Sequence, residues 1–143
     1  MATVTRIEIR PADAAERDRI QAIWDEAGLG RTAPDEWDAL MSGDTAVVLV
    51  AVDDQDIVGT AIAAFDGWRA YIYHVAVAGT HRRKGIGHQL MDAAEQYLLS
   101  TGARHVFVMV NEENTEALAL VGANGYIPEG EIVLTKRLAT RFA

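Results

Sequence analysis

Apolar residues recur along the chain in patterns that predict strands. Residues 5–10 alternate, with Ile7 and Ile9 on one face, which predicts a short strand that Pro11 ends. Residues 46–52 form an almost unbroken apolar run, typical of a strand that is buried on both faces. Turn signals such as Asp66-Gly67 separate further strands predicted at 57–65, 70–77, 106–110 and 132–138.

Apolar positions spaced three or four residues apart predict four helices. Asp13 is expected to cap the first helix and Gly28 to end it; its apolar positions are Ile20, Ile23, Trp24 and Ala27. Pro34 precedes a second helix at about 35–41, and the others are predicted at about 85–100 and 113–123. The order β-α-α-β-β-β-α-β-α-β indicates one α/β domain over residues 1–143, with helices on both faces of a mixed sheet.

Composition and charge reduce the number of functional classes to which the protein could belong. The 143 residues are 50% apolar and 24% charged, which is ordinary for a globular domain. A net charge of −8 disfavours binding to nucleic acid or to anionic membranes and suits a cationic substrate. The sequence has neither an apolar run of about 20 residues nor a signal segment, so we expect a cytoplasmic protein without membrane contact. With no cysteine and no carboxylates at metal-ligand spacing, no metal is expected.

The segment 77–88 carries the clearest functional pattern. Gly85 and Gly87 stand where a helix is expected to begin, and unpaired N–H groups and the helix dipole favour an anion there. Arg82, Arg83 and Lys84 oppose that dipole, so we expect an anionic ligand to compensate them. Leu90 replaces the third glycine of a dinucleotide fingerprint, and no Gly-Lys-Ser/Thr sequence of a Walker loop follows.

These residues resemble two signatures of the GNAT superfamily of N-acetyltransferases. The first is Arg82-x-x-Gly85-x-Gly87 between a strand and a helix, and the second is Asn114-x-x-Ala117 followed by Gly125-Tyr126. The resemblance spans about residues 7–138 and extends to small bacterial members of the YpeA-like type. It implies a GNAT-like acyl-CoA N-acyltransferase fold. It also implies an acetyl-CoA-dependent enzyme that moves an acetyl group directly to a primary amine of a small molecule or peptide.

The resemblance also implies where acetyl-CoA binds. The strand before the loop would diverge from its parallel neighbour, and the pantetheine arm would pair there with Val75, Ala76 and Val77. Backbone amides would bind the pyrophosphate, from Arg82, Arg83, Lys84, Gly85, Ile86, Gly87 and His88. Asn114 would contact the pantetheine or the thioester, with Ala117 leaving space beside it. Asn114 also fits a second role, as the N-cap of the last helix.

The catalytic groups usual in this family are missing. Val121 stands where the family has a tyrosine acid, and the positions of its usual glutamate hold Tyr71, Tyr73 or Met109. Tyr73 and Tyr126 remain as candidate acids. His74 remains as a candidate base, because histidine ordinarily titrates near pH ~6.5. Strict alternation places His74 on the opposite sheet face from Tyr73, and a packed or surface histidine is the alternative.

Acceptor recognition and oligomeric state have weaker signals. Trp37, in the second short helix, is expected to line the substrate pocket, and Glu112 is a candidate contact for a cationic substrate, with a solvated loop as the alternative for Glu112. Two other functions stay open, a non-catalytic acyl-CoA-binding or sensing module and a phosphate-binding domain unrelated to CoA. Family members are often dimers, and the last predicted strand offers an edge through which a homodimer could form.

Overall fold

The computed structural model describes residues 6–138, so Thr5 of the first predicted strand lies outside the described residues. The chain divides into two compact units, one up to Val108 and one from Met109, and each is described by itself. The first unit holds a five-stranded sheet and three α-helices, and the second holds one α-helix. This confirms the predicted α/β class. The assignment of 1–143 to one domain stays a prediction.

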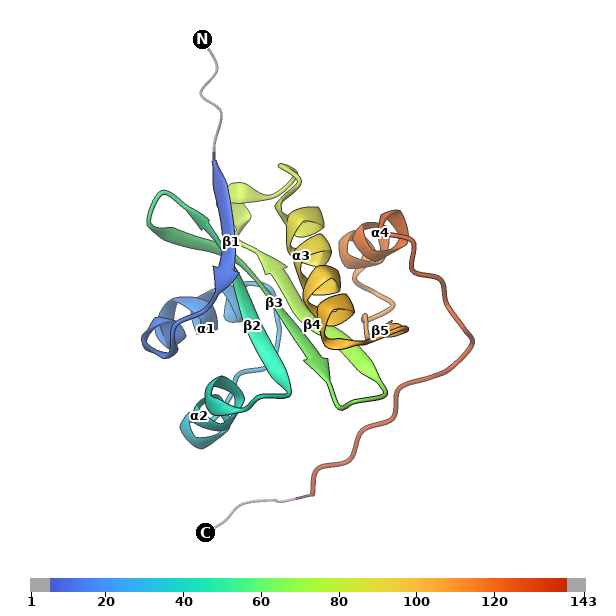
Figure 1. Ribbon diagram of the computed structural model, residues 1–143. Helices are drawn as coiled ribbons and strands as arrows, with labels where there is room; N and C mark the ends of the chain where they lie inside the picture. The colour runs from blue at the N-terminus through green and yellow to red at the C-terminus, as the bar shows by residue number, and fades with distance from the viewer. Residues whose placement is uncertain (1–5, 139–143) are drawn as a thin grey trace. The chain divides into compact units, whose positions relative to one another are not determined.

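The sheet of the first unit has the order β1-β2-β3-β4-β5 (Figure 1). The strands are β1 (Ile7–Pro11), β2 (Ala46–Asp53), β3 (Asp56–Phe65), β4 (Ala70–Val77) and β5 (Val106–Val108). Strands β1 to β4 pair antiparallel, and β5 pairs parallel to β4. The sheet is therefore mixed, as predicted, because a helical crossover between β4 and β5 returns the chain in the same direction.

Helices cover both faces of this sheet (Figure 1). They are α1 (Arg17–Glu26), which follows a short 3₁₀ turn η1 (Ala14–Glu16), α2 (Pro34–Ser42) and α3 (Ile86–Thr101). One core joins α1 and α2 to the sheet through buried side chains such as Ile20, Trp24 and Val50. On α3, Leu90, Met91, Ala94 and Leu98 are buried at helical spacing, as predicted.

The second unit contains α4 (Thr115–Ala123) and no strand within its described residues. The prediction of a last strand at 132–138 is therefore wrong. The alternation of Ile132 and Leu134 gives local β propensity, but a strand also needs a hydrogen-bonded neighbour, and the second unit supplies none. Strand β5 likewise ends at Val108, before the predicted limit at Val110.

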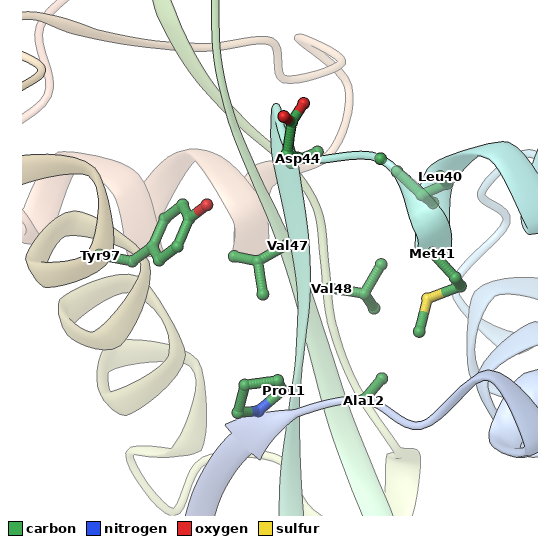
Figure 2. Close-up of a pocket in the computed structure, with 10 residues that line it drawn as sticks. Pro11, Ala12, Leu40, Met41, Asp44, Val47, Val48 and Tyr97 are labelled. Carbon is green, nitrogen blue, oxygen red and sulfur yellow. The ribbon is translucent and has the colours of Figure 1, made fainter. Parts of the chain in front are cut away.

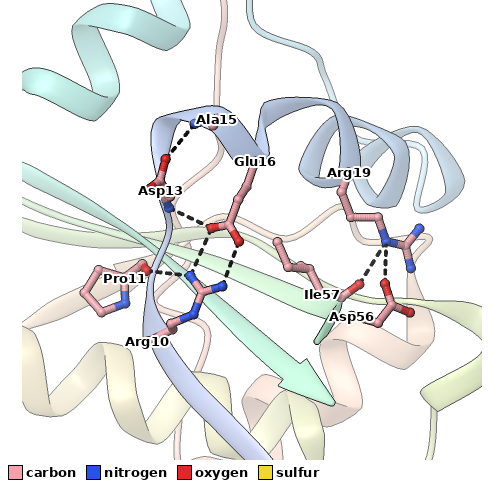
Figure 3. A network of polar contacts seen from close by, with 8 residues as sticks. All are labelled: Arg10, Pro11, Asp13, Ala15, Glu16, Arg19, Asp56 and Ile57. Carbon is pink, nitrogen blue, oxygen red and sulfur yellow. Dashed lines mark hydrogen bonds and ion pairs between the residues drawn. The ribbon is translucent and has the colours of Figure 1, made fainter. Parts of the chain in front are cut away.

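A network of polar contacts holds the start of the first helical segment to β1 (Figure 3). The Asp13 carboxylate accepts the N–H of Ala15 at 2.9 Å, and the Glu16 carboxylate accepts the N–H of Asp13 at 2.7 Å. This confirms Asp13 as a cap, with Glu16 as its reciprocal partner. Arg10 donates to both oxygens of Glu16 at 2.9 and 2.7 Å, and this contact lowers the pKa of the Glu16 carboxyl below its usual value.

Replacing Glu16 tests this network through its pH dependence. We expect Glu16→Gln to lower the free energy of unfolding by about 1 kcal/mol at pH 7, because a bidentate ion pair and a cap are both weakened. Since the folded-state pKa is the lower one, the stabilisation is present above the unfolded-state pKa. It is lost as the pH falls through the folded-state pKa. Urea unfolding at several pH values measures the effect, and Glu131→Gln, at an exposed glutamate outside this network, is the control. A difference that persists unchanged at pH 2 would contradict the account.

Candidate active site

Strand β4 is longer than its parallel partner β5 and extends beyond the end of it. It pairs with β5 only through Ala70, Tyr71 and Ile72, opposite Val106, Phe107 and Val108. Within the first unit, residues 73–77 of β4 therefore have no strand on that side. The backbone N–H and C=O groups along this edge can pair with an extended ligand that carries amides, as in the addition of a strand to a sheet.

A β-bulge interrupts β4 where it leaves β5. His74 and Val75 of β4 stand opposite the single residue Ala61 of β3, because Thr60 pairs with Ala76 and Ile62 with Tyr73. His74 has a φ of 52°, a left-handed conformation that is uncommon for a residue with a side chain. The buried Thr60 hydroxyl donates to the His74 carbonyl at 2.9 Å and accepts the indole N–H of Trp24 at 2.9 Å. These two hydrogen bonds fix the bulge to α1.

The bulge corrects the predicted orientation of His74. Its ring contacts Trp24 edge-on, with centroids 4.8 Å apart, and lies 5.6 Å from the ring of Tyr73. Both side chains therefore lie on the face covered by α1, because the extra residue cancels one step of the alternation. The His74 Nε2 lies 2.9 Å from the carbonyl oxygen of Gly30. A carbonyl only accepts, so Nε2 carries a proton, and Nδ1 is the atom of neutral His74 that can take one.

Tyr73 lies half-buried against the core beneath α1 and α2. Burial raises the pKa of its phenol above the usual value. The phenol therefore keeps its proton at neutral pH and can serve as a hydrogen-bond or proton donor. It is not suited to act as a base.

Four contacts anchor the loop that follows β4. The N–H of Ala78 donates to the carbonyl of Val58 at 2.8 Å, and the N–H of Gly79 donates to the Glu26 carboxylate at 2.7 Å. The third is between His81 Nε2 and the Asp53 carboxylate, at 2.7 Å. Arg82 donates through Nε to the carbonyl of Val77 at 3.1 Å. The loop is thus tied to β2, β3 and α1 before its basic residues, and to β4 through the first of them, Arg82.

Helix α3 begins without a side-chain cap. Its N-cap residue Gly85 has a φ of 81°, which favours glycine, and a Cβ at this position would meet no atom within 4 Å. The first intrahelical hydrogen bond runs from the Gln89 N–H to the Gly85 carbonyl, so the amides of residues 86–88 have no acceptor inside the helix. These free donors lie at the positive end of the helix dipole, where their chemistry suits an anion.

The basic residues of the loop reinforce this site. Arg82, Arg83 and Lys84 are exposed, and none of them forms a salt bridge with a residue of the described range 6–138. Arg83 has a φ of 63°, a second left-handed residue two positions before Gly85. Uncompensated cations beside free amides indicate a polyanionic ligand such as a pyrophosphate.

A known sequence family matches the part of the chain that contains this arrangement. The sequence model of the "Acetyltransferase (GNAT) family" matches residues 13–126 of the 143. The chain belongs to the GNAT acetyltransferase family. The match includes both β4 and the loop that leads into α3.

Solved structures of several other proteins share this fold. The aminoglycoside acetyltransferase meta-AAC0020 from an uncultured soil metagenomic sample, in complex with sisomicin, is 20% identical with a TM-score of 0.80; the match covers 93% of this chain and 96% of that chain. AAC(6')-Iy, in complex with the bisubstrate analog CoA-S-monomethyl-acetylneamine, is 16% identical with a TM-score of 0.79. This match covers 94% of this chain and 100% of that chain. A transcriptional regulator from Bacillus halodurans C-125 is 17% identical with a TM-score of 0.78, and the match covers 92% of this chain and 100% of that chain. The GNAT-like fold is thereby confirmed.

The second GNAT signature lies in the second unit. Asn114 caps α4, because its side-chain oxygen accepts the N–H of Ala117 at 3.1 Å, which confirms the capping role considered for it. Tyr126 donates its backbone N–H to the carbonyl of Val121 at 3.1 Å, and Glu112 lies in the turn before α4. The roles of these residues toward acetyl-CoA or an acceptor stay predictions.

Trp37 does not line a substrate pocket. It is only 2% exposed, its ring lies edge-on to Trp24 with centroids 6.3 Å apart, and its indole N–H donates to the Ala14 carbonyl at 3.1 Å. The prediction failed because a tryptophan in a short amphipathic helix fits a pocket wall and a core equally well by sequence. Burial of both its apolar body and its polar tip identifies Trp37 as a core residue.

A pocket of about 400 Å³ lies apart from the loop (Figure 2). It forms where β1 ends beside β2, between Leu40 and Met41 of α2 on one side and Tyr97 of α3 on the other. It shares no lining residue with residues 73–88, so it takes no part in the candidate site.

Two further features of the described chain bear on ligands and location. Among residues 6–138, no three His, Cys, Asp or Glu side chains are grouped so as to hold a metal ion. No helix in that range has the length and apolar character needed to cross a bilayer.

Removing the Thr60 hydroxyl tests the account of the bulge. We expect Thr60→Val to lower the free energy of unfolding by about 2 kcal/mol, because the Trp24 N–H and the His74 carbonyl each lose their partner in a buried place. Thr60→Ser keeps the hydroxyl and should retain most of the stability. Urea denaturation of the three proteins measures this. A Thr60→Val protein within about 0.5 kcal/mol of wild type would contradict the account, since such a change is typical of a neutral site.

Proposed function

We propose that this protein is an acetyl-CoA-dependent N-acetyltransferase that acts on a primary amine. One observation carries the proposal: the unpaired edge of β4, residues 73–77, leads directly into an uncapped helix N-terminus. A ligand that carries amides at one end and a pyrophosphate at the other matches these two features in the order in which they follow one another along the chain. Membership of the GNAT family supports acetyl transfer as the activity.

Each part of acetyl-CoA has a matching part of the chain. The backbone of Val75, Ala76 and Val77 would pair with the pantetheine amides. The amides from Arg82 to His88 would hold the pyrophosphate, with the exposed side chains of Arg82, Arg83 and Lys84 beside it. The second-unit residues Asn114 and Ala117 are proposed at the thioester end by the family signature alone.

The reaction is a direct transfer between two bound substrates. The neutral amine nitrogen forms a bond to the thioester carbonyl carbon, the carbon–sulfur bond breaks, and the electron pair leaves with the sulfur. A backbone N–H of β4, from Val75 or Val77, would stabilise the negative charge that develops on the carbonyl oxygen. The nitrogen loses one proton, for which His74 Nδ1 is the proposed acceptor because Nε2 is held by Gly30.

Proton donation to the departing sulfur has two candidates. Tyr73 is favoured, because burial raises the pKa of its phenol and it lies on the same face as His74. Tyr126 of the second unit is the other. A thiolate also leaves without full protonation, so we expect loss of the donor to slow the reaction rather than to abolish it.

A non-catalytic acyl-CoA-binding module is the second candidate function. It is favoured by Val121, which replaces the family's usual tyrosine. The two functions differ in turnover: release of free thiol that depends on an added amine indicates an enzyme, and tight binding without such release indicates a binding module.

A substitution at the N-terminus of α3 tests the proposed binding site of the pyrophosphate. We expect Gly85→Asp to weaken acetyl-CoA binding by at least about tenfold, because it adds a negative charge and bulk where an anion should bind. Isothermal titration calorimetry measures the affinity.

Gly102→Asp is the matched control. Gly102 ends the same helix with a φ of 106°, and a Cβ there would also meet no atom within 4 Å. Both variants therefore carry the same charge change and similar backbone strain, at opposite ends of α3. Equal affinities for acetyl-CoA in the Gly85→Asp and wild-type proteins would reject the loop assignment.

A further inference from the structure

Aromatic side chains line the face of the sheet beside the proposed thioester position. Tyr71 and Tyr73 point to one face of β4, since Ile72 between them is fully buried on the other. Phe107 of β5 stands opposite Tyr71, with ring centroids 5.7 Å apart. A bound acceptor that approaches Tyr73 from the hairpin end of β4 would therefore pass over these rings.

Arg69 lies at the hairpin end of this aromatic strip. Its guanidinium carbon is 4.7 Å from the ring centroid of Trp68 and 5.3 Å from that of Phe107. Trp68 is 77% exposed, so the stack is open to solvent. Two rings thus hold the guanidinium in place near the level of Tyr71.

Arg69 has no carboxylate within salt-bridge distance among residues 6–138. The nearest acidic residue in sequence, Asp66, accepts the backbone N–H groups of Trp68 and Arg69, each at 2.8 Å. These hydrogen bonds, and to a smaller extent the attraction between the Asp66 carboxylate and the charge of Arg69, lower the pKa of Asp66. In this chain of net charge −8, three other arginines also lack a salt bridge within that range, namely Arg82, Arg83 and Arg104. Arg69 differs from them in its contacts with two aromatic rings.

Stacking leaves the recognition edge of the guanidinium available. Both ring contacts are made close to the guanidinium carbon, whereas the N–H donors of a guanidinium lie in its plane and point outward. This planar fork matches the two oxygens of a carboxylate, and less rotational entropy is lost when the side chain is already held. The chemistry of the position is therefore that of a carboxylate anchor.

We infer that the acceptor is an amine that also carries a carboxylate, as in a short peptide or an amino-acid derivative, and that Arg69 binds this carboxylate. This inference rests on the proposed acetyltransferase function. The rise along β4 from the level of Tyr71 to that of Tyr73 or Val75 spans two to four residues. The amine and the carboxylate should therefore lie about 7–13 Å apart.

This acceptor class differs from the aminoglycosides of the structural neighbours. An aminoglycoside such as sisomicin carries several ammonium groups, which Arg69 would repel. The inference therefore predicts low activity on aminoglycosides in spite of the shared fold.

Paired acceptors that differ only in the carboxylate test the inference. The probes are Nα-acetyl-lysine and triglycine, each compared with its carboxyl-terminal amide, with thiol release as the assay. For wild type we expect kcat/KM to be at least about tenfold higher for each acid than for its amide. In Arg69→Gln this preference should fall to about one, through a higher KM for the acids, while kcat/KM for the amides changes little.

Two controls separate recognition from structure. Arg104→Gln removes the same charge from an exposed arginine near β5 that is not part of the stack, and it should keep the wild-type preference. Urea unfolding of both variants reports any loss of stability. An acid-to-amide ratio near one in wild type, or a ratio unchanged in Arg69→Gln, would overturn the inference.

The test also distinguishes this inference from the proposed function. Wild type that binds acetyl-CoA and acetylates other amines, but turns over neither acid, would overturn the carboxylate anchor and leave the acetyltransferase assignment intact. Wild type that fails to bind acetyl-CoA would overturn the proposed function, and the inference with it.

Discussion

The hydrogen bond from the Thr60 hydroxyl to the His74 carbonyl fixes the conformation on which the site depends. It holds an extra residue in β4, and a bulged strand bends and twists more strongly than a regular one. The pairing of β4 with β5 ends at Ile72, two residues before His74. One buried threonine therefore stands at the junction of the paired half of β4 and its open half. Trp24 connects the same hydroxyl to α1.

The open half of β4 and the loop after it make up the proposed binding surface. The strand edge offers backbone groups to a neutral, extended ligand, and the helix N-terminus offers them to an anion. The contact between His81 and Asp53 and the hydrogen bond from Gly79 to Glu26 hold the loop without using the side chains of Arg83 and Lys84. Those cations remain available in a chain that is otherwise acidic, so the local charge is opposite to the net charge.

Local patterns in the sequence were sufficient to predict most elements of the first unit. Strand β4 has the predicted bounds, and α3 begins one residue after Gly85, because turn residues and apolar spacing act over a few neighbouring positions. The position of His74 could not be predicted in this way. Its bulge is held by Thr60 and Trp24, which are distant in sequence, and alternation contains no signal for them.

The remaining errors have the same origin. The predicted strand at 132–138 depends on a pairing partner, and the burial of Trp37 depends on its contact with Trp24. The contact of His81 with Asp53 and that of Arg69 with the Phe107 ring also join residues far apart in sequence. The residue types of the loop predict an anion site, and this assignment stays a prediction. The contacts that hold the loop, and those that hold the Arg69 side chain against Phe107, became visible only in the folded chain.

Amide hydrogen exchange along β4 tests the central claim most directly. Acetyl-CoA should slow exchange both at residues 73–77, which the pantetheine would cover, and at residues 82–88, which would hold the pyrophosphate. ATP shares only the phosphates and the nucleoside, so it should protect the loop without the strand. Protection of the loop alone by both ligands would contradict the account, because the open edge of β4 would then have no part in binding.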